Sequence, residues 1–191
     1  MAIPLFRKLI DIYPDFETLA TADVSQVAEL MRPLGLQNQR ATTLINLALI
    51  WAQNPPLKGR RICTPNYPTH SASRDIKSGE ILADDDPREG AFEIGHIAGL
   101  GAYAFDSWRI FCRDQLRGLA DSWNGEGTSG TFEPEWKRVL PKDKELKAFL
   151  RWMWLKEGWK WDPESGEKEV ASEELMRKGQ EGGLSSDDYD S

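Results

Sequence analysis

The chain has 191 residues, of which 40% are hydrophobic, with eight Trp and only two Cys; this fits one domain with extensions and excludes a disulfide framework and a membrane span of ~20 apolar residues. No signal-peptide pattern opens the sequence, so we expect a reducing compartment and no secretion. The net charge of −7 belongs to residues 161–191, since residues 1–160 hold 21 basic and 21 acidic side chains, and a neutral body does not exclude DNA binding.

The first part of the chain is predicted to be helical. Apolar residues recur at helical spacing over residues 3–13, 24–31 and 39–53, and Asp23 is a typical N-cap for the second of these helices. Each helix is closed by a proline: Pro14, Pro33 and Pro55. Residues 54–90 are rich in Pro, Ser, Gly and Asp and lack periodicity, which predicts a long, partly mobile loop.

The second part of the chain is predicted to hold three more helices and two irregular segments. The helices cover residues 93–97, 103–119 and 144–158, the segment 121–134 is a glycine-rich loop, and the acidic tail from Pro163 is expected to be disordered. No strand pattern of any length is visible. The predicted fold class is therefore all-α.

The turn Gly99-Leu100-Gly101 lies between two of these helices and carries the strongest local signal. Glycine accepts positive φ at little cost, so two glycines around one apolar residue allow a tight hairpin. The first amides of the following helix and its dipole suit a phosphate group. This favours a grip on a nucleic-acid backbone, with a plain connector between helices as the alternative. The dinucleotide-binding fingerprint is excluded, because it needs a preceding strand and a third glycine.

The segment from Gly99 to Cys112 resembles the helix-hairpin-helix segment of DNA glycosylases, and more narrowly the mismatch thymine/uracil glycosylase domain of the methyl-CpG-binding glycosylase family. The resemblance covers residues 1–55 and 91–158, apart from residues 113–133. Further matching pieces occur in the right order: Arg32-Pro33-Leu34-Gly35-Leu36, Arg40-Ala41, Glu135-Trp136-Lys137-Arg138-Val139, Pro141-Lys142-Asp143, Leu146 and Trp152-Met153-Trp154. It implies a helix-hairpin-helix DNA glycosylase fold.

The resemblance implies two catalytic-site residues. Asp143 matches the family's catalytic aspartate, whose carboxylate stabilises positive charge on the sugar and activates water; taken alone, an Asp before an apolar helix is an N-cap. Tyr103 stands where bifunctional relatives such as endonuclease III carry a lysine. Because Tyr cannot form a Schiff base, the implied chemistry is hydrolysis without strand cleavage. Tyr103 would contact the flipped base, and a buried core aromatic is the alternative.

The DNA-binding residues follow from the same resemblance. Leu36 matches a wedge that fills the gap left by a flipped base. The hairpin residues Gly99, Leu100, Gly101 and Ala102 would hold a phosphate, and Lys144 would offset the extra carboxylate of Glu145, which stands where the family has Lys. Asp106 is expected to pack or cap locally.

Other residues carry weaker signals. Trp152, Trp154, Trp159 and Trp161 are expected to pack in the core rather than to stack on bases. Cys63, His70, His96 and Cys112 lack zinc spacing, and two cysteines cannot hold an iron–sulfur cluster, so we expect no metal and no cofactor. Lys58-Gly59-Arg60-Arg61 is a small basic patch, expected in a solvated loop.

The sequence therefore predicts a glycosylase domain over residues 1–160, with residues 54–90 and 113–133 as insertions and an acidic tail over 161–191. The expected protein is a nuclear, monomeric, monofunctional DNA N-glycosylase of base-excision repair that removes thymine or uracil mispaired with guanine in double-stranded DNA. The resembled domain has a further helix before the position of Met1. The alternative is a non-catalytic DNA-binding module or an inactive glycosylase fragment, and a helical protein-interaction domain is a third possibility.

Overall fold

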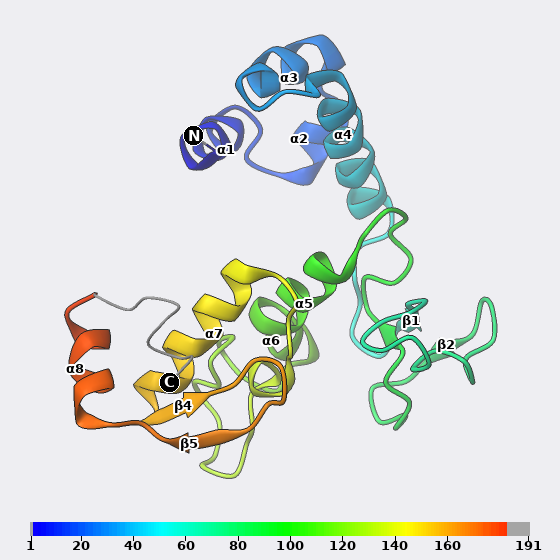
Figure 1. Ribbon diagram of the computed structural model, residues 1–191. Helices are drawn as coiled ribbons and strands as arrows, with labels where there is room; N and C mark the ends of the chain where they lie inside the picture. Colours follow the sequence, from blue (N-terminus) through cyan, green and yellow to red (C-terminus); the bar gives the residue numbers. More distant parts are fainter. Residues whose placement is uncertain (1, 183–191) are drawn as a thin grey trace.

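The computed structural model describes residues 2–182 and is mostly helical (Figure 1). Among these residues, no helix combines the length and apolarity needed to cross a membrane. The elements in chain order are α1 (Ala2–Ile12), α2 (Phe16–Ala20), α3 (Val24–Met31), η1 (Arg32–Leu34), α4 (Gln37–Gln53), β1 (Arg61–Cys63), β2 (Ile81–Leu82), β3 (Ala91–Phe92), α5 (Ala102–Phe111), α6 (Arg113–Arg117), η2 (Glu135–Arg138), α7 (Lys144–Lys156), β4 (Trp159–Trp161), β5 (Lys168–Val170) and α8 (Glu173–Gln180).

The first four helices form one apolar unit, which lies together at the top of Figure 1. Asp15 and Asp23 accept backbone N–H bonds at the starts of α2 and α3, so two turns are fixed by local capping. The buried core of the unit consists of Leu9, Leu19, Val27, Ala28, Met31, Ala41 and Ala48. The three helices expected from periodicity are confirmed, and the short α2 is an addition.

The prediction that the chain holds no strands is wrong in detail. Strands β2, β1 and β3 form a small antiparallel sheet, in which Ile62 pairs with Ile81 on one side and with Phe92 on the other. Each strand has only two or three residues, which is too short for a period-two pattern. The chain between residues 54 and 90 is therefore a folded insertion, not a plain loop.

Arg61 organises this insertion from within. It is 3% exposed, and its guanidinium donates to the backbone carbonyls of Ala83, Asp86, Arg88 and Ala91. Backbone carbonyls buried without partners cost free energy, so one arginine satisfies acceptors that the short sheet leaves open. The expectation of a solvated basic patch at residues 58–61 is wrong for Arg61.

Residues 93–97, expected as a helix, form successive turns after β3. Gly95 explains this locally, because a Cβ at this residue would meet the carbonyl oxygen of Ile62 in β1 at 2.2 Å. Glu93 is 1% exposed and accepts hydrogen bonds from Arg113 of α6 and Trp108 of α5. Close packing of backbone against backbone therefore replaces the first helix before the hairpin.

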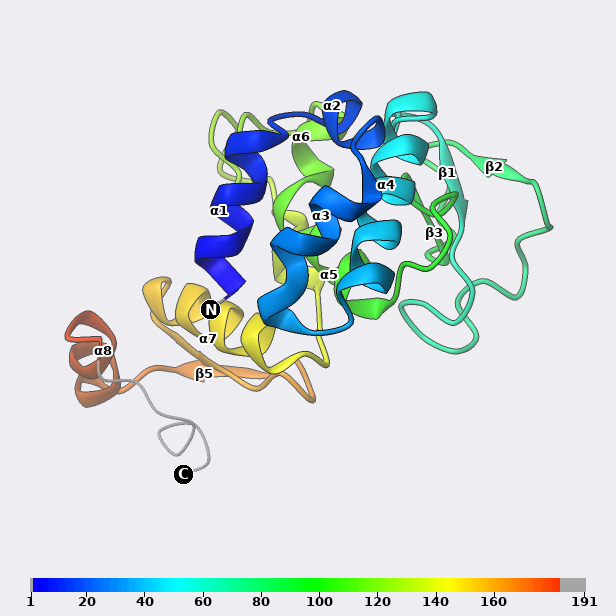
Figure 2. The ribbon, with the colours of Figure 1, turned by 90° about the horizontal axis from the view of Figure 1, so that it is seen from above.

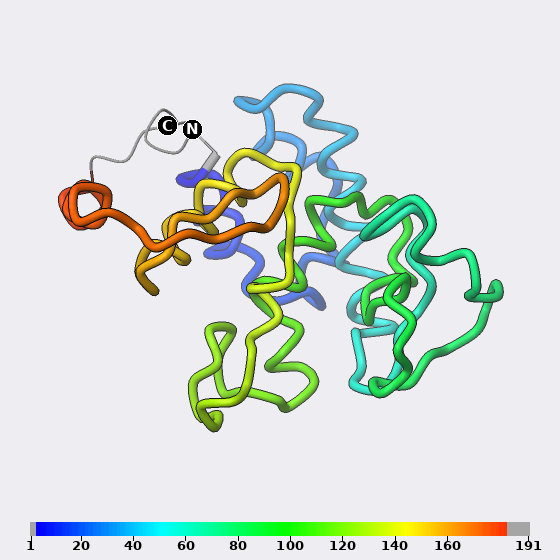
Figure 3. The backbone as a smooth tube through the Cα atoms, turned by 60° about the horizontal axis from the view of Figure 1, so that its bottom comes forward, coloured from blue at the N-terminus to red at the C-terminus, as the bar shows by residue number. Residues whose placement is uncertain are grey.

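The second helical unit packs α5, η2, α7 and β4 around a core rich in aromatic residues. The helix expected over residues 103–119 is broken at Cys112 into α5 and α6, and α7 ends at Lys156. Ile110, Trp136, Leu150, Trp154 and Trp161 are all buried in this core. Figure 2 shows the first unit lying over α5 and α7, and Figure 3 shows the insertion and the segment after α6 extending in different directions.

The expected disordered tail differs from the structure in its described part. Strands β4 and β5 pair antiparallel, with Trp161 opposite Lys168, and α8 follows with Leu175 buried. Trp161 is 2% exposed because it packs on α7, so the body extends past residue 160. Residues 183–191 lie outside the described residues.

Candidate nucleic-acid interface and active site

The glycine hairpin presents open backbone at the start of α5. Gly99 has φ of +85°, which favours glycine, and Gly101 is the N-cap of α5 without any side-chain cap. A Cβ at either glycine would meet nothing within 4 Å, so the turn faces open space. Leu100 packs against the apolar cluster of Phe105 and Trp108 and thereby anchors the turn. Uncapped amides at a rigid, accessible helix start can receive an anion.

Tyr103 lies on the first turn of α5 and is 58% exposed. The alternative interpretation as a buried core aromatic is therefore wrong. Its ring and hydroxyl are available to a ligand at the hairpin end of the helix. Ala102, beside it, is also exposed.

Asp143 is the N-cap of α7, and its Oδ1 accepts the backbone N–H groups of Glu145 and Leu146 at 2.9 and 3.1 Å. The N-cap interpretation is thus correct, and it leaves a catalytic role open. Oδ2 accepts no hydrogen bond from the described residues, so one carboxylate oxygen is held while the other remains available. Lys144 is 90% exposed and lies 3.7 Å from Glu145, which is also exposed.

Leu36 has a conformation that its residue type disfavours. It is the N-cap of α4 with φ of +49° and ψ of +34°, and it is 69% exposed. A left-handed backbone costs a residue with a Cβ about 1–2 kcal/mol. The preceding Gly35 also has positive φ, and its carbonyl accepts the Nε–H of Arg40 at 3.1 Å. The turn therefore holds an apolar side chain out in solvent at a cost in stability, which favours a functional role.

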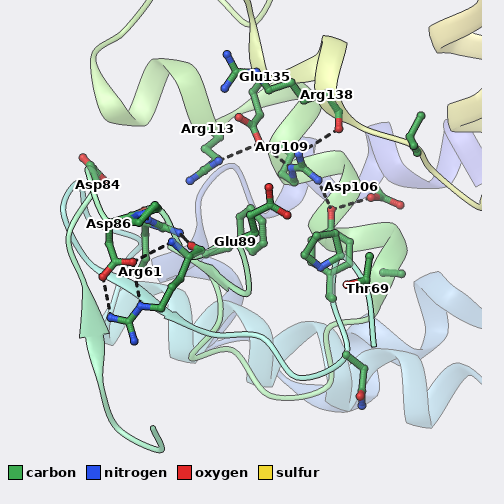
Figure 4. A pocket seen from close by; sticks show the side chains of 18 of the residues that line it. Arg61, Thr69, Asp84, Asp86, Glu89, Asp106, Arg109, Arg113, Glu135 and Arg138 are labelled. Carbon is green, nitrogen blue, oxygen red and sulfur yellow. Dashed lines mark hydrogen bonds and ion pairs between the residues drawn. The ribbon is translucent and has the colours of Figure 1, made fainter. Parts of the chain in front are cut away.

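A cleft of about 530 Å³ lies between the insertion and the second helical unit. One face of α5 lines it through Ala102, Asp106 and Arg109, and Arg113 of α6 continues this face. Figure 4 shows Arg109 and Arg113 converging on Glu135 at one side of the cleft, with Arg61, Asp84 and Asp86 at another. The cleft reaches Lys142, the residue before Asp143, so the starts of α5 and α7 adjoin the same hollow.

A buried ion network forms the floor of the cleft. Glu135 Oε1 accepts from Arg109 Nε at 2.6 Å and from Arg113 Nη1 at 2.9 Å. Arg113 Nε also donates to Glu93, which accepts the indole N–H of Trp108 at 2.9 Å. Burial opposes ionisation of Glu135, but the two guanidinium groups outweigh it and hold its pKa below the usual range. Sequence reasoning missed this network, although the four-residue spacing of Arg109, Arg113 and Arg117 was visible.

Asp106 and Tyr67 join the insertion to α5. The Tyr67 hydroxyl donates to Asp106 Oδ1 at 2.7 Å, and both residues are about 5% exposed. Burial raises the pKa of Asp106 despite this hydrogen bond and the nearby Arg109, and the negative charge of Asp143 acts in the same direction as burial. Asp106 is therefore packed, as expected, but its partner lies 39 residues away rather than locally.

The remaining candidates are the tryptophans and the possible metal ligands. Trp154 and Trp161 are buried in the core, as expected, whereas Trp152 and Trp159 are 41% and 37% exposed. His96 hydrogen-bonds the carbonyl of Asn54. Within residues 2–182, no group of three or more His, Cys, Asp or Glu side chains is arranged to hold a metal ion.

The protein is thus a mostly helical one in which a helix start with a glycine hairpin and an exposed Tyr, and a second helix start capped by an Asp, adjoin one cleft. Residues 1–172 match the sequence model of a family described as the HhH-GPD superfamily base excision DNA repair protein. The chain belongs to this superfamily, whose members are DNA glycosylases, and DNA is therefore its substrate.

Proposed function

We propose that this protein is a monofunctional DNA N-glycosylase that hydrolyses the glycosidic bond of thymine or uracil mispaired with guanine, acting in the nucleus. The observation that carries the proposal is that the hairpin end of α5 and the Asp143 end of α7 adjoin one cleft, through Ala102 and Lys142. A phosphate grip and a carboxylate at neighbouring helix starts suit a reaction at the sugar of a flipped nucleotide.

Each residue has a distinct role in this mechanism. Backbone amides around Gly101 bind a DNA phosphate, and Leu36 enters the gap that the flipped nucleotide leaves. The free oxygen of Asp143 faces the charge that builds on the sugar and orients the attacking water. Tyr103 contacts the flipped base and supplies no amine, so no Schiff base forms and the strand stays intact.

The test is an excision assay on duplexes that contain one G·T or G·U mispair. The protein should produce abasic sites that alkali converts to strand breaks, and without alkali the strand should stay whole. Asp143→Asn keeps a side chain able to cap α7 but loses the carboxylate, and the rate should fall by about 10²–10⁴-fold.

Asp23→Asn is the matched control, because Asp23 caps α3 with the same pair of backbone bonds, to Ser25 and Gln26. It should leave the excision rate unchanged. Full activity of Asp143→Asn would overturn the role given to Asp143. Borohydride trapping of the protein on DNA would overturn the monofunctional assignment.

The alternative is a non-catalytic DNA-binding module. Glu145 favours it, because an exposed carboxylate two residues after Asp143 places a second negative charge beside the site. This alternative predicts duplex binding that weakens with salt and no abasic product at any pH. A protein-interaction domain would bind no duplex even at low salt.

A further inference from the structure

The cleft beside the hairpin concentrates positive charge in an acidic protein. The chain carries a net charge of −7. Seven basic and five acidic side chains line the cleft, which leaves it positive when all are ionised. The basic members are Arg61, Arg88, Arg109, Arg113, Arg117, Arg138 and Lys142. A cleft with an excess of positive side chains raises the local concentration of anionic ligands.

Most of these cations are already engaged inside the protein. Arg61 donates to backbone carbonyls, and Arg109 and Arg113 share Glu135. Arg117 faces Asp84 at 3.6 Å, and Arg88 pairs with Glu80 and Asp86. These side chains shape the wall and cannot turn to a ligand without leaving buried groups unpaired.

Two cations at the rim are different. Arg138 is 58% exposed, and its partner Glu133, at 2.9 Å, is 51% exposed. An exposed pair of this kind contributes only about 0–1 kcal/mol, so Arg138 can exchange its partner for a stronger anion. Lys142 is exposed, has no ion pair within the described residues, and directly precedes the cap of α7.

The two exposed cations lie in the same cleft as the start of α5, where the hairpin would hold a DNA phosphate. The cleft touches Ala102 at the start of α5, directly after the glycine hairpin, and extends to Lys142 and Arg138. Asn66 and Thr69 of the insertion also line it. A DNA strand with one phosphate on the hairpin amides must continue along one side of α5 or the other. If it continues along the side that lines the cleft, its next phosphates meet Arg138 and Lys142.

We propose that the cleft between the insertion and α5 is a second DNA-backbone subsite, in which Lys142 and Arg138 bind a phosphate next to the one held by the hairpin. The ligand is a phosphodiester of the DNA strand. The inference rests on DNA binding by the proposed glycosylase but not on its catalysis. The subsite includes the insertion, whose residues 66–69 line the cleft.

The test measures binding to a fully matched duplex at several salt concentrations. Lys142→Ala and Arg138→Ala should each weaken binding, and together they should reduce the slope of log affinity against log salt by about 0.9 for each phosphate that the protein no longer neutralises. Replacing Glu89, an exposed acid of the cleft, by Gln should tighten binding.

The controls have the same chemistry away from the cleft. Arg177→Ala removes an exposed arginine of α8 that pairs with Glu181, as Arg138 pairs with Glu133. Lys77→Ala removes an exposed lysine of the insertion that does not line the cleft. Both should leave the slope unchanged.

The outcomes separate this inference from the proposed function. If the cleft variants keep the slope of the controls while the protein still excises bases, the subsite is wrong and the glycosylase stands. If they lower the slope although no mispair yields an abasic site, the subsite stands and the proposed catalysis is wrong.

Discussion

The unit of α1–α4 and the region around the cleft are stabilised in opposite ways. In the first, Val27, Ala41 and Ala48 are fully buried, and the core is entirely apolar. The buried charged side chains of the described residues all line the cleft or hydrogen-bond to a residue that does. They are Arg61, Glu93, Asp106, Arg113, Asp114 and Glu135. Apolar packing needs no particular partner, whereas each buried charge needs one.

The contrast indicates which region couples the shape of the cleft to the stability of the fold. The buried charges hold the insertion against α5, so they fix the wall of the cleft as well as the fold. The apolar unit carries Leu36 at its edge but no charged group of the site. Damage to the network should therefore alter the wall of the cleft, and damage to the apolar unit should act mainly on stability.

Glu135→Ala should have the largest effect on stability. It leaves Arg109 and Arg113 buried without their shared carboxylate, and breaking such a network costs about 3–5 kcal/mol. Glu133→Ala, which removes an exposed partner of Arg138, should cost at most about 1 kcal/mol. Urea denaturation of both variants measures the difference, and equal losses would contradict the distinction between the regions.

The effect of Glu135 should also depend on pH. Its pKa is lowered in the folded state, so its stabilisation is present above the unfolded pKa and is lost as the pH falls through the folded value. The difference in the free energy of unfolding between wild type and Glu135→Ala should therefore become smaller at acid pH. A gap that widens on acidification would reverse the assigned sign.

Arg61→Met should loosen the insertion. Four carbonyl acceptors lose their donor, which we expect to cost about 2–3 kcal/mol, because hydrogen bonds to charged groups are strong and the four bonds are buried or partly buried. Amide hydrogen exchange should accelerate in residues 81–92 and stay unchanged in α3 and α4. Arg60→Met, which removes a single bond to Asn54, is the control.

Val27→Ala should cost about 2 kcal/mol, from reduced burial and a small cavity in the apolar unit. Because no charge is involved, the loss should be the same at pH 5 and pH 8. Thermal melts at both values provide the measurement. A marked pH dependence would show that the two regions are not stabilised independently.

Asp106→Asn should have the smallest effect on stability, and unlike the other substitutions it should stabilise the protein. Burial raises the folded pKa of Asp106, so its ionisation lowers stability as the pH rises from the unfolded pKa through the folded value. Asn still accepts the hydroxyl of Tyr67 and cannot ionise. The variant should therefore melt higher than wild type at pH 8 and equal it at low pH. A lower melting temperature at pH 8 would contradict this.

The sequence predicted what depends on neighbouring residues. The helical spacing of apolar residues located α1, α3, α4 and α7, and local capping chemistry located Asp23 and Asp143 as N-caps. The glycine pair located the turn before α5. These features involve interactions within a few residues, so their signals survive in the linear chain.

Features that depend on distant partners became visible only once the chain was folded. Arg61 meets the carbonyl of Ala91 across 30 residues, and Tyr67 meets Asp106 across 39. The strands of the insertion are too short to show an alternating apolar pattern. Residues 93–97 do not form the expected helix, because the backbone of β1 lies against Gly95. A buried charge reveals its partner only once the chain has folded, and for that reason the cleft was not visible in the sequence.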